Sequence, residues 1–87
     1  MTSRHAEAFL EMMAAERGAA DNTLEAYRRD LEALEGFLRA RGETVETADR
    51  HALAAFAERR GRAGYAASSQ ARTLSAVRRF FRFLYAE

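Results

Sequence analysis

Three arginines near the end of the chain have the side-chain type and the spacing to bind a phosphate backbone. Arg72, Ser75, Arg79 and Arg82 recur at intervals of three or four residues, which places them along one side of a helix. Guanidinium and hydroxyl groups both donate hydrogen bonds to phosphate oxygens. An ordinary solvated helix face could show the same spacing, but such a face usually carries both signs of charge.

The surroundings of these arginines contain no acidic residue and offer further phosphate donors. Ser68 and Ser69 fall where the helix would begin, so hydroxyls there would join free backbone N–H groups at the positive end of the helix dipole. Residues 63–86 contain no Asp or Glu. Residues 1–49 carry six Arg and eleven acidic residues, whereas residues 50–87 carry eight Arg and two acidic residues. This asymmetry predicts a polyanionic partner for the second half.

No group of residues predicts catalysis or metal binding. Tyr27 lies in an apolar pattern, Tyr85 closes the last helical segment, and Tyr65 lies in a connector; none has a neighbouring base or other activating group. His5 and His51 are too far apart in sequence to show metal-ligand spacing. We therefore expect no catalytic residue, no metal and no cofactor in this chain.

The composition also predicts the compartment. There is no cysteine, and no apolar run approaches the roughly 20 residues that span a bilayer. Residues 1–5 lack the apolar core of a secretory signal. These features predict a soluble cytoplasmic protein with no membrane contact.

The elements that would position the arginines are four helices, expected at about residues 3–17, 22–41, 48–60 and 68–85. The chain contains no proline and no alternating β pattern. Predicted capping residues are Ser3, Asn22 or Asp21, and Thr47, with the last helix starting at Ser68 or Ser69. Gly18 and Gly42 would end the first two helices, and residues 61–64 would form a flexible connector.

Each predicted helix has an apolar stripe. Their members are Ala6, Phe9, Leu10 and Met13; Leu24, Tyr27, Leu31, Leu34 and Leu38; Leu53, Phe56 and Ala57; and Leu74, Val77, Phe81 and Leu84, with Phe80 beside the last stripe. Such stripes predict an all-α fold, a compact bundle of four helices around one core that folds alone as a monomer. Arg72 and Arg79 would then face away from the core, so replacing either by alanine should change stability by no more than about 0.5 kcal/mol.

Two longer motifs carry a family resemblance. Residues 22–31 read NTLEAYRRDL, and residues 74–85 read LSAVRRFFRFLY. These resemble the signatures that open the second helix and end the fourth helix in the N-terminal core-binding domain of Xer-type tyrosine recombinases, and the phage integrases share the pattern. The opening Phe9-Leu10-Glu11 and Glu16-Arg17-Gly18 also fit, so the resemblance spans the whole chain. The ending favours the XerD branch over XerC.

The resemblance implies a SAM-like core-binding domain over residues 1–87. In this family the domain forms half of a C-shaped clamp on double-stranded DNA, with its second and fourth helices at the DNA and its first helix at other recombinase protomers. The family's catalytic residues belong to a second domain, absent from this chain. Carried over by position, the DNA-binding residues would be Thr23, Arg28, Arg29, Ser68, Ser69, Arg72, Ser75 and Arg79, to which the helical spacing adds Arg82. Glu25 departs from relatives that place a basic or polar residue there.

One alternative function remains open from the sequence. The arginine face could bind an acidic protein, as in a small helical interaction module or the dimerisation domain of a regulator. Salt dependence separates the two, because binding that neutralises about four to six DNA phosphates gives a slope of roughly −4 to −5 in a plot of log K against log salt. A protein interface of similar size would respond less steeply. The outer face of the first helix, with Glu7, Glu11 and Ala14, is expected to face a neighbouring protomer or solvent.

Overall fold

The protein folds into four α-helices, as seen in a computed structural model that describes residues 3–18 and 20–86. The two chain ends and residue 19 of the expected domain lie outside the described residues. The helices are α1 (Arg4–Arg17), α2 (Asp21–Ala40), α3 (Arg50–Arg62) and α4 (Ala67–Tyr85). No strand occurs within the described residues, so the all-α prediction is confirmed. None of these helices is long and apolar enough to cross a membrane.

The local signals at the helix ends are partly confirmed. Ser3 caps α1 by accepting a hydrogen bond from the Ala6 N–H, and Gly18 ends the helix with a φ of 59°. The cap of α3 is Asp49, which accepts from the Ala52 N–H. The prediction that Thr47 caps this helix is wrong, because its hydroxyl bonds to the backbone of Thr44 and closes a separate turn in the preceding loop.

The other predicted starts and the connector differ from the structure. α2 begins after Ala20 and α4 after Ala66, and neither helix has a capping side chain. The predicted caps Asp21, Asn22, Ser68 and Ser69 lie inside the first turns instead. Residues 61 and 62 still belong to α3, so the connector lies two residues later, as a turn over residues 63–66. Packing of the whole helix overrides the weak local preference for a capping residue.

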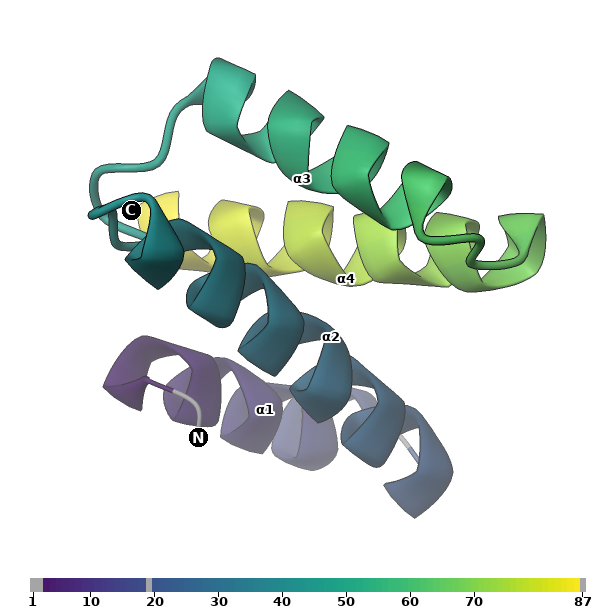
Figure 1. Cartoon of the computed structure of the whole chain (residues 1–87). Coiled ribbons are helices and arrows are strands. Elements are labelled where there is room, and N and C mark those ends of the chain that lie inside the picture. Colours follow the sequence, from purple (N-terminus) through teal and green to yellow (C-terminus); the bar gives the residue numbers. More distant parts are fainter. Residues whose placement is uncertain (1–2, 19, 87) are drawn as a thin grey trace.

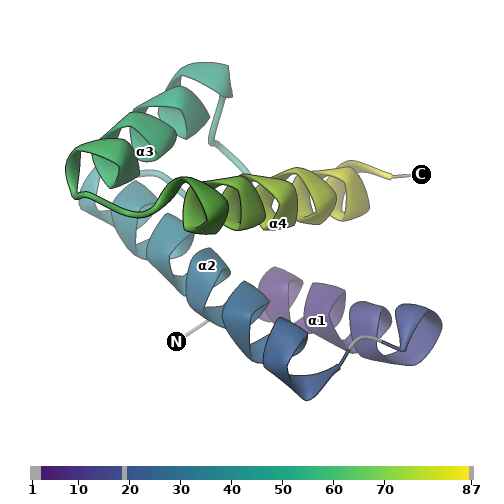
Figure 2. The ribbon, with the colours of Figure 1, turned by 90° about the vertical axis from the view of Figure 1, so that its right-hand side faces the viewer.

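α2 and α4 form the centre of the bundle. Each packs against the other three helices, whereas α1 and α3 make no contact with each other within the described residues. Figure 1 shows α1 beside α2 and α3 beside α4, with α2 crossing α4. Figure 2 shows the first half of α2 diverging from α4 after this crossing, with α1 alongside it. A helix with neighbours on several sides must bury a wide arc of its surface.

This central position shifts the buried stripe of α4 away from the predicted one. Phe80, which the pattern placed beside the stripe, is completely buried and packs edge-on against Phe9 with ring centroids 5.6 Å apart. Leu74, Phe81 and Leu84 are only half-buried. The fully buried side of α4 is formed by Thr73, Ala76, Val77 and Phe80. The predicted stripes of α1 and of α2 from Tyr27 onward are confirmed as core.

Candidate nucleic-acid interface

The N-termini of α2 and α4 form one end of the molecule. Both lie on the right-hand side of Figure 1, and this side faces the viewer in Figure 2. Neither first turn has a side-chain cap, whereas Ser3 and Asp49 cap the other two helices. The first N–H groups of an uncapped helix lack an intrahelical acceptor and sit at the positive end of the dipole. This end therefore offers two sets of backbone donors to an anion.

Hydroxyl groups accompany both sets of donors. Thr23 lies in the first turn of α2, and Ser68 and Ser69 lie in the first turn of α4. Thr23 and Ser68 are exposed, and Ser69 is half-buried. The structure thus places these three predicted residues at one end of the fold, although none of them caps its helix.

One side of α4 faces the space next to the first two helices. Ser68, Arg72, Ser75 and Arg79 lie on this side by helical spacing. Arg72 bonds to α2, while Arg79 and Arg82 line a hollow of about 630 Å³ together with Phe9, Met12 and Met13 of α1. Ser75 is half-buried, and Arg79 and Arg82 are exposed without an ion-pair partner in the described part of the chain. α4 contains no acidic residue to offset these charges.

Arg72 is not the solvated side chain that the sequence predicted. Its Nε and one terminal nitrogen donate to the two carboxylate oxygens of Asp30, at 3.1 and 2.8 Å. The Asp30 side chain is 2% exposed and the Arg72 side chain 41%. The hydrogen bonding of Arg72 to Asp30 is the main cause that raises the pKa of Arg72 above its usual value. The premise of the stability prediction, that the Arg72 side chain is free of the fold, is therefore wrong, and we now expect its removal to destabilise the protein because a buried carboxylate would lose its charged partner.

The Asp30 carboxylate belongs to a larger buried polar cluster. Thr73 donates to Asp30 at 2.9 Å and accepts from a terminal nitrogen of Arg60 at 3.2 Å. Arg60 is 8% exposed, and its guanidinium carbon lies 4.0 Å from the ring centroid of Tyr65 and 5.6 Å from that of Phe56. We call Asp30, Arg60, Arg72 and Thr73 the Asp30 cluster; it joins α2, α3 and α4.

Three members of this cluster, Asp30, Arg60 and Thr73, were not predicted from the sequence, although the sequence contains a signal for two of them. Asp30 lies three residues after Tyr27 and four before Leu34, so it interrupts the apolar stripe of α2. Arg60 lies four residues after Phe56 on α3, which is also a core position of a helix. A charged residue at a core position is rarely tolerated unless it is paired, so these positions predict buried partners.

The two arginines of α2 that were predicted to bind DNA, Arg28 and Arg29, differ in whether they are paired within the fold. Arg28 turns towards α1, where it forms a hydrogen-bonded ion pair with Glu7, and it lies 3.9 Å from Glu25. The Glu7 hydrogen bond is the main cause that raises the pKa of Arg28. Arg29 is exposed and has no ion-pair partner among the described residues. Glu7 is thus paired with α2, and its predicted place on the outer face of α1 is wrong. Glu11 and Ala14 are exposed on that face.

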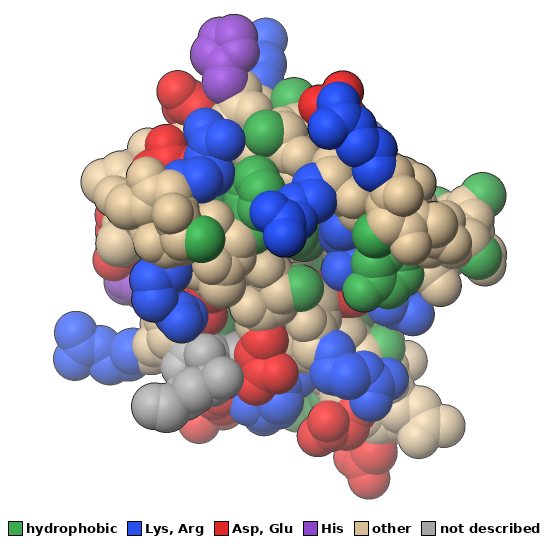
Figure 3. All heavy atoms as spheres, viewed as in Figure 1, with side chains coloured by type: hydrophobic (Ala, Val, Ile, Leu, Met, Phe, Trp, Pro, Cys, Tyr) green, Lys and Arg blue, Asp and Glu red, His purple; other side chains and the backbone are tan. Residues whose placement is uncertain are grey.

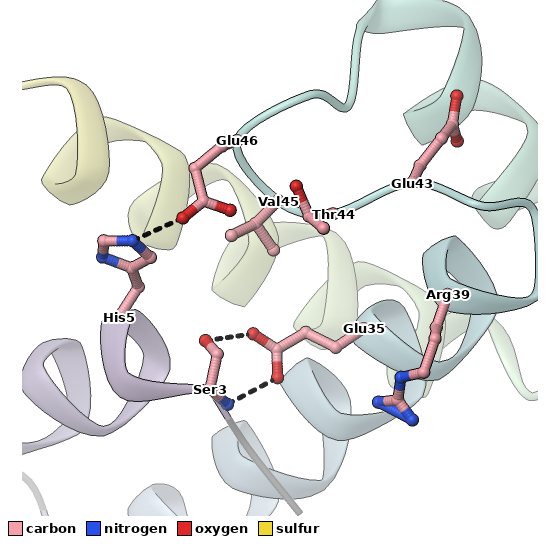
Figure 4. Close-up of a pocket in the computed structure, with 8 residues that line it drawn as sticks. All are labelled: Ser3, His5, Glu35, Arg39, Glu43, Thr44, Val45 and Glu46. Carbon is pink, nitrogen blue, oxygen red and sulfur yellow. Dashed lines mark hydrogen bonds and ion pairs between the residues drawn. The ribbon is translucent and has the colours of Figure 1, made fainter.

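Other surfaces of the molecule are less suited to phosphate. The face drawn in Figure 3 carries arginines, but several of them lie against acidic side chains. A hollow of about 390 Å³ near the N-terminus of α1 is lined by Glu35, Glu43 and Glu46, among other residues (Figure 4). The pKa of Glu46 is held below its usual range, first by a backbone hydrogen bond and then by His5 at 2.7 Å. These carboxylates would repel a phosphate.

The same hollow contains the anchor of α1 and supports a stability prediction. Glu35 is buried and accepts hydrogen bonds from both the backbone N–H and the hydroxyl of Ser3 (Figure 4). Ser3→Ala would remove the α1 cap and one Glu35 partner, so we expect the free energy of unfolding to fall by about 1–2 kcal/mol. Urea denaturation would measure this change. The control Thr47→Ala removes only local bonds in an exposed turn, and an equal loss in both variants would contradict the anchoring role.

Comparison with known proteins identifies relatives along the whole chain. Residues 6–87 match the family described as phage integrase, N-terminal SAM-like domain. The chain is 53% identical over 87 residues to the tyrosine recombinase XerD of Rhizobium meliloti, covering 100% of this chain and 28% of that protein. It is 54% identical over 81 residues to XerD of Brucella abortus, covering 93% of this chain and 26% of that one. It therefore spans little more than a quarter of these relatives. No solved structure shows a significant match.

Proposed function

Because the chain belongs to the phage integrase N-terminal SAM-like domain family, as its two motifs predicted, we propose that it is the DNA-binding module of a site-specific tyrosine recombinase. The matched relatives are named tyrosine recombinases and are more than three times as long. We place the catalytic residues in the part of the longer protein that this chain does not include. The module itself would grip double-stranded DNA and take no part in the chemistry.

The observation that best supports this proposal is that two helices without a capping side chain begin at the same end of the molecule, and that one of them, α4, contains no acidic residue. Backbone N–H groups at helix starts and guanidinium groups are both among the usual donors to DNA phosphates. Both occur along the side of α4 that begins at Ser68 and continues through Arg79. α2 supplies the second helix start, at the same end of the molecule (Figure 1). Donors on two helices can contact phosphates along more than one stretch of a DNA strand.

The contacts we propose follow the predicted set with one change of role. The backbone contacts would come from Thr23, Arg29, Ser68, Ser69, Arg72, Ser75, Arg79 and Arg82. Arg28 would join them only by exchanging its Glu7 partner for a phosphate, because its guanidinium is engaged with α1. An interface of this kind would position the duplex largely through its backbone, and the DNA sequence would be read by few side chains.

Removing an exposed arginine of α4 should weaken DNA binding without harming the fold. We expect Arg79→Ala and Arg82→Ala to reduce affinity for duplex DNA, and each lost phosphate contact should lower the salt slope by about one unit. Both side chains are exposed, so stability should change by no more than about 0.5 kcal/mol. Fluorescence anisotropy with a labelled duplex at several salt concentrations would measure the affinity and the salt slope.

A matched control uses an arginine at the far end of the fold. Arg50 is also exposed and starts α3, which begins at the end of the molecule opposite the α2 and α4 N-termini (Figure 1). Arg50→Ala removes the same charge and should leave the salt slope unchanged. If all three variants lose affinity equally, the binding depends on net charge alone and the proposed face is wrong.

A protein partner is the second candidate, and one observation favours it. The hollow lined by Arg79 and Arg82 is also lined by apolar side chains, including Phe9, Met12 and Phe83. An apolar surface beside two arginines could receive an acidic amphipathic helix. DNA binding with a salt slope of roughly −4 to −5 supports the first proposal, whereas no salt-dependent DNA binding would favour the second.

A further inference from the structure

We propose that Asp30 is a positioning residue that holds the Arg72 guanidinium with its free edge turned towards a DNA phosphate. This inference rests on the proposed function, because it assigns a phosphate to Arg72. It goes beyond that function by giving the buried carboxylate, which cannot reach the DNA, a role in binding it.

The hydrogen bonds divide the Arg72 guanidinium into a held edge and a free edge. A guanidinium has five N–H donors arranged in a rigid plane. Asp30 accepts from Nε and from one terminal nitrogen. The remaining three donors have no acceptor among the described residues, and the side chain is 41% exposed. A planar group fixed along one edge can still bind a phosphate along the other.

Asp30 is itself held in place by groups from two other helices. Thr73 of α4 donates to the same Asp30 oxygen, Oδ1, that accepts from the terminal nitrogen of Arg72. Thr73 is completely buried and in turn accepts from Arg60 of α3, which stacks on Tyr65. A carboxylate with 2% exposure and these partners has little freedom to rotate. Arg72 would therefore lose little side-chain entropy on binding, which favours affinity.

The charge of Asp30 does not argue against a phosphate nearby. The Asp30 cluster contains one carboxylate and two guanidiniums, so it keeps a net positive charge. The carboxylate lies beneath Arg72, and a phosphate at the free edge would meet the guanidinium first. Two explanations therefore predict opposite changes in DNA affinity when the charge of Asp30 is removed. A purely electrostatic effect predicts that removing the Asp30 charge strengthens DNA binding, whereas the positioning role predicts that it weakens binding.

The first test compares Asp30→Asn with an acid removed elsewhere on α2. Asn has a similar shape, but an NH2 donor replaces one of the two acceptor oxygens, so the Arg72 nitrogen that faces this donor loses its partner. We expect Asp30→Asn to bind duplex DNA roughly threefold to tenfold more weakly than wild type. The control Glu25→Gln removes an exposed charge near the α2 N-terminus and should strengthen binding. Equal or tighter binding by a folded Asp30→Asn variant would overturn the positioning role.

A second pair of variants keeps the charge and tests the shape of the donor. Lysine at position 72 can pair with Asp30, but its compact ammonium cannot hold a carboxylate on one edge and a phosphate on the other. Arg72→Lys should therefore lose roughly tenfold in affinity. Arg79 has no ion-pair partner among the described residues, so Arg79→Lys should stay within about twofold. Equal affinity of Arg72→Lys and wild type would overturn the inference, even if Asp30→Asn fails to fold.

The outcome for the wild-type chain separates this inference from the proposed function. If wild type shows no salt-dependent binding to duplex DNA, the proposed function fails. If wild type binds and the Arg79→Ala effect appears, but the two Asp30 cluster tests fail, the DNA-binding function stands and Asp30 has only a structural role. Circular dichroism of each variant establishes that the helices are intact.

Discussion

The variant Phe80→Ala is expected to lose about 3–5 kcal/mol of its free energy of unfolding. Phe80 is completely buried and packs against Phe9 and Phe81, with ring centroids 5.6 and 5.4 Å apart. Replacing a buried Phe by Ala removes transfer free energy and leaves a cavity, and both effects destabilise the fold. A domain of this size has a total stability of about 4–13 kcal/mol, so the loss would be a large part of it. Thermal and urea denaturation would measure the change.

Phe81→Ala is the matched control because it makes the same substitution at the next position of α4. Phe81 is half-buried and stacks on the exposed ring of Tyr85. Its loss should cost about 1–2 kcal/mol, since less apolar area returns to water. The apolar pattern of the sequence predicts the opposite order, with Phe81 inside the stripe and Phe80 beside it. A larger loss for Phe81→Ala would show that α4 is rotated relative to the structure.

Removing the carboxylate of the Asp30 cluster should have the next largest effect on stability. Asp30→Ala leaves Arg60 buried beside Thr73 without a nearby negative charge, and it removes both bonds to Arg72. Breaking a buried ion pair from one side costs about 3–5 kcal/mol. Because Arg72 is half-exposed and can turn to water, we expect the lower end, about 3 kcal/mol. Urea denaturation would test this, and a loss below about 1 kcal/mol would contradict it.

Two of the arginines of α4, Arg72 and Arg79, provide the comparison for this prediction. Arg72→Ala should destabilise the protein by more than about 1 kcal/mol, because Asp30 loses its bidentate partner. Arg79→Ala should leave stability almost unchanged, as exposed substitutions usually do. From the sequence alone the two residues are equivalent, since they lie two helical turns apart on the same side. A double-mutant cycle between Asp30→Ala and Arg72→Ala would measure their coupling directly.

Local patterns predicted the four helices because amphipathic periodicity and glycine termini are properties of short segments. The bounds fall within about two residues of those expected, which is the usual uncertainty of helix ends. The core of α1 and the run from Tyr27 to Leu38 on α2 were also predictable, since each helix presents one apolar stripe. The caps of α2, α3 and α4 were not, because several polar residues compete near each start and packing chooses among them.

The candidate interface was predictable in part, and its role in DNA binding stays a prediction. The absence of acids from residues 63–86 and the spacing of Arg79 and Arg82 could be read directly. Both side chains are exposed in the structure. Two other arginines were misjudged: Arg28 bonds to Glu7, 21 residues away, and Arg72 bonds to Asp30, 42 residues away. Pairing over such distances in sequence leaves no local pattern.

The fold class, the family and the basic character of α4 can be predicted from the sequence, because helix period, motif spacing and charge order depend only on the order of residues along the chain. The buried side of α4 and the pairing of its arginines with carboxylates depend on how the helices pack in three dimensions. α4 contacts three helices at once, so no single helical pattern specifies its buried side. Its buried arc therefore extends beyond the apolar stripe to Thr73 and brings Arg72 to the edge of the core, where Asp30 of α2 meets it.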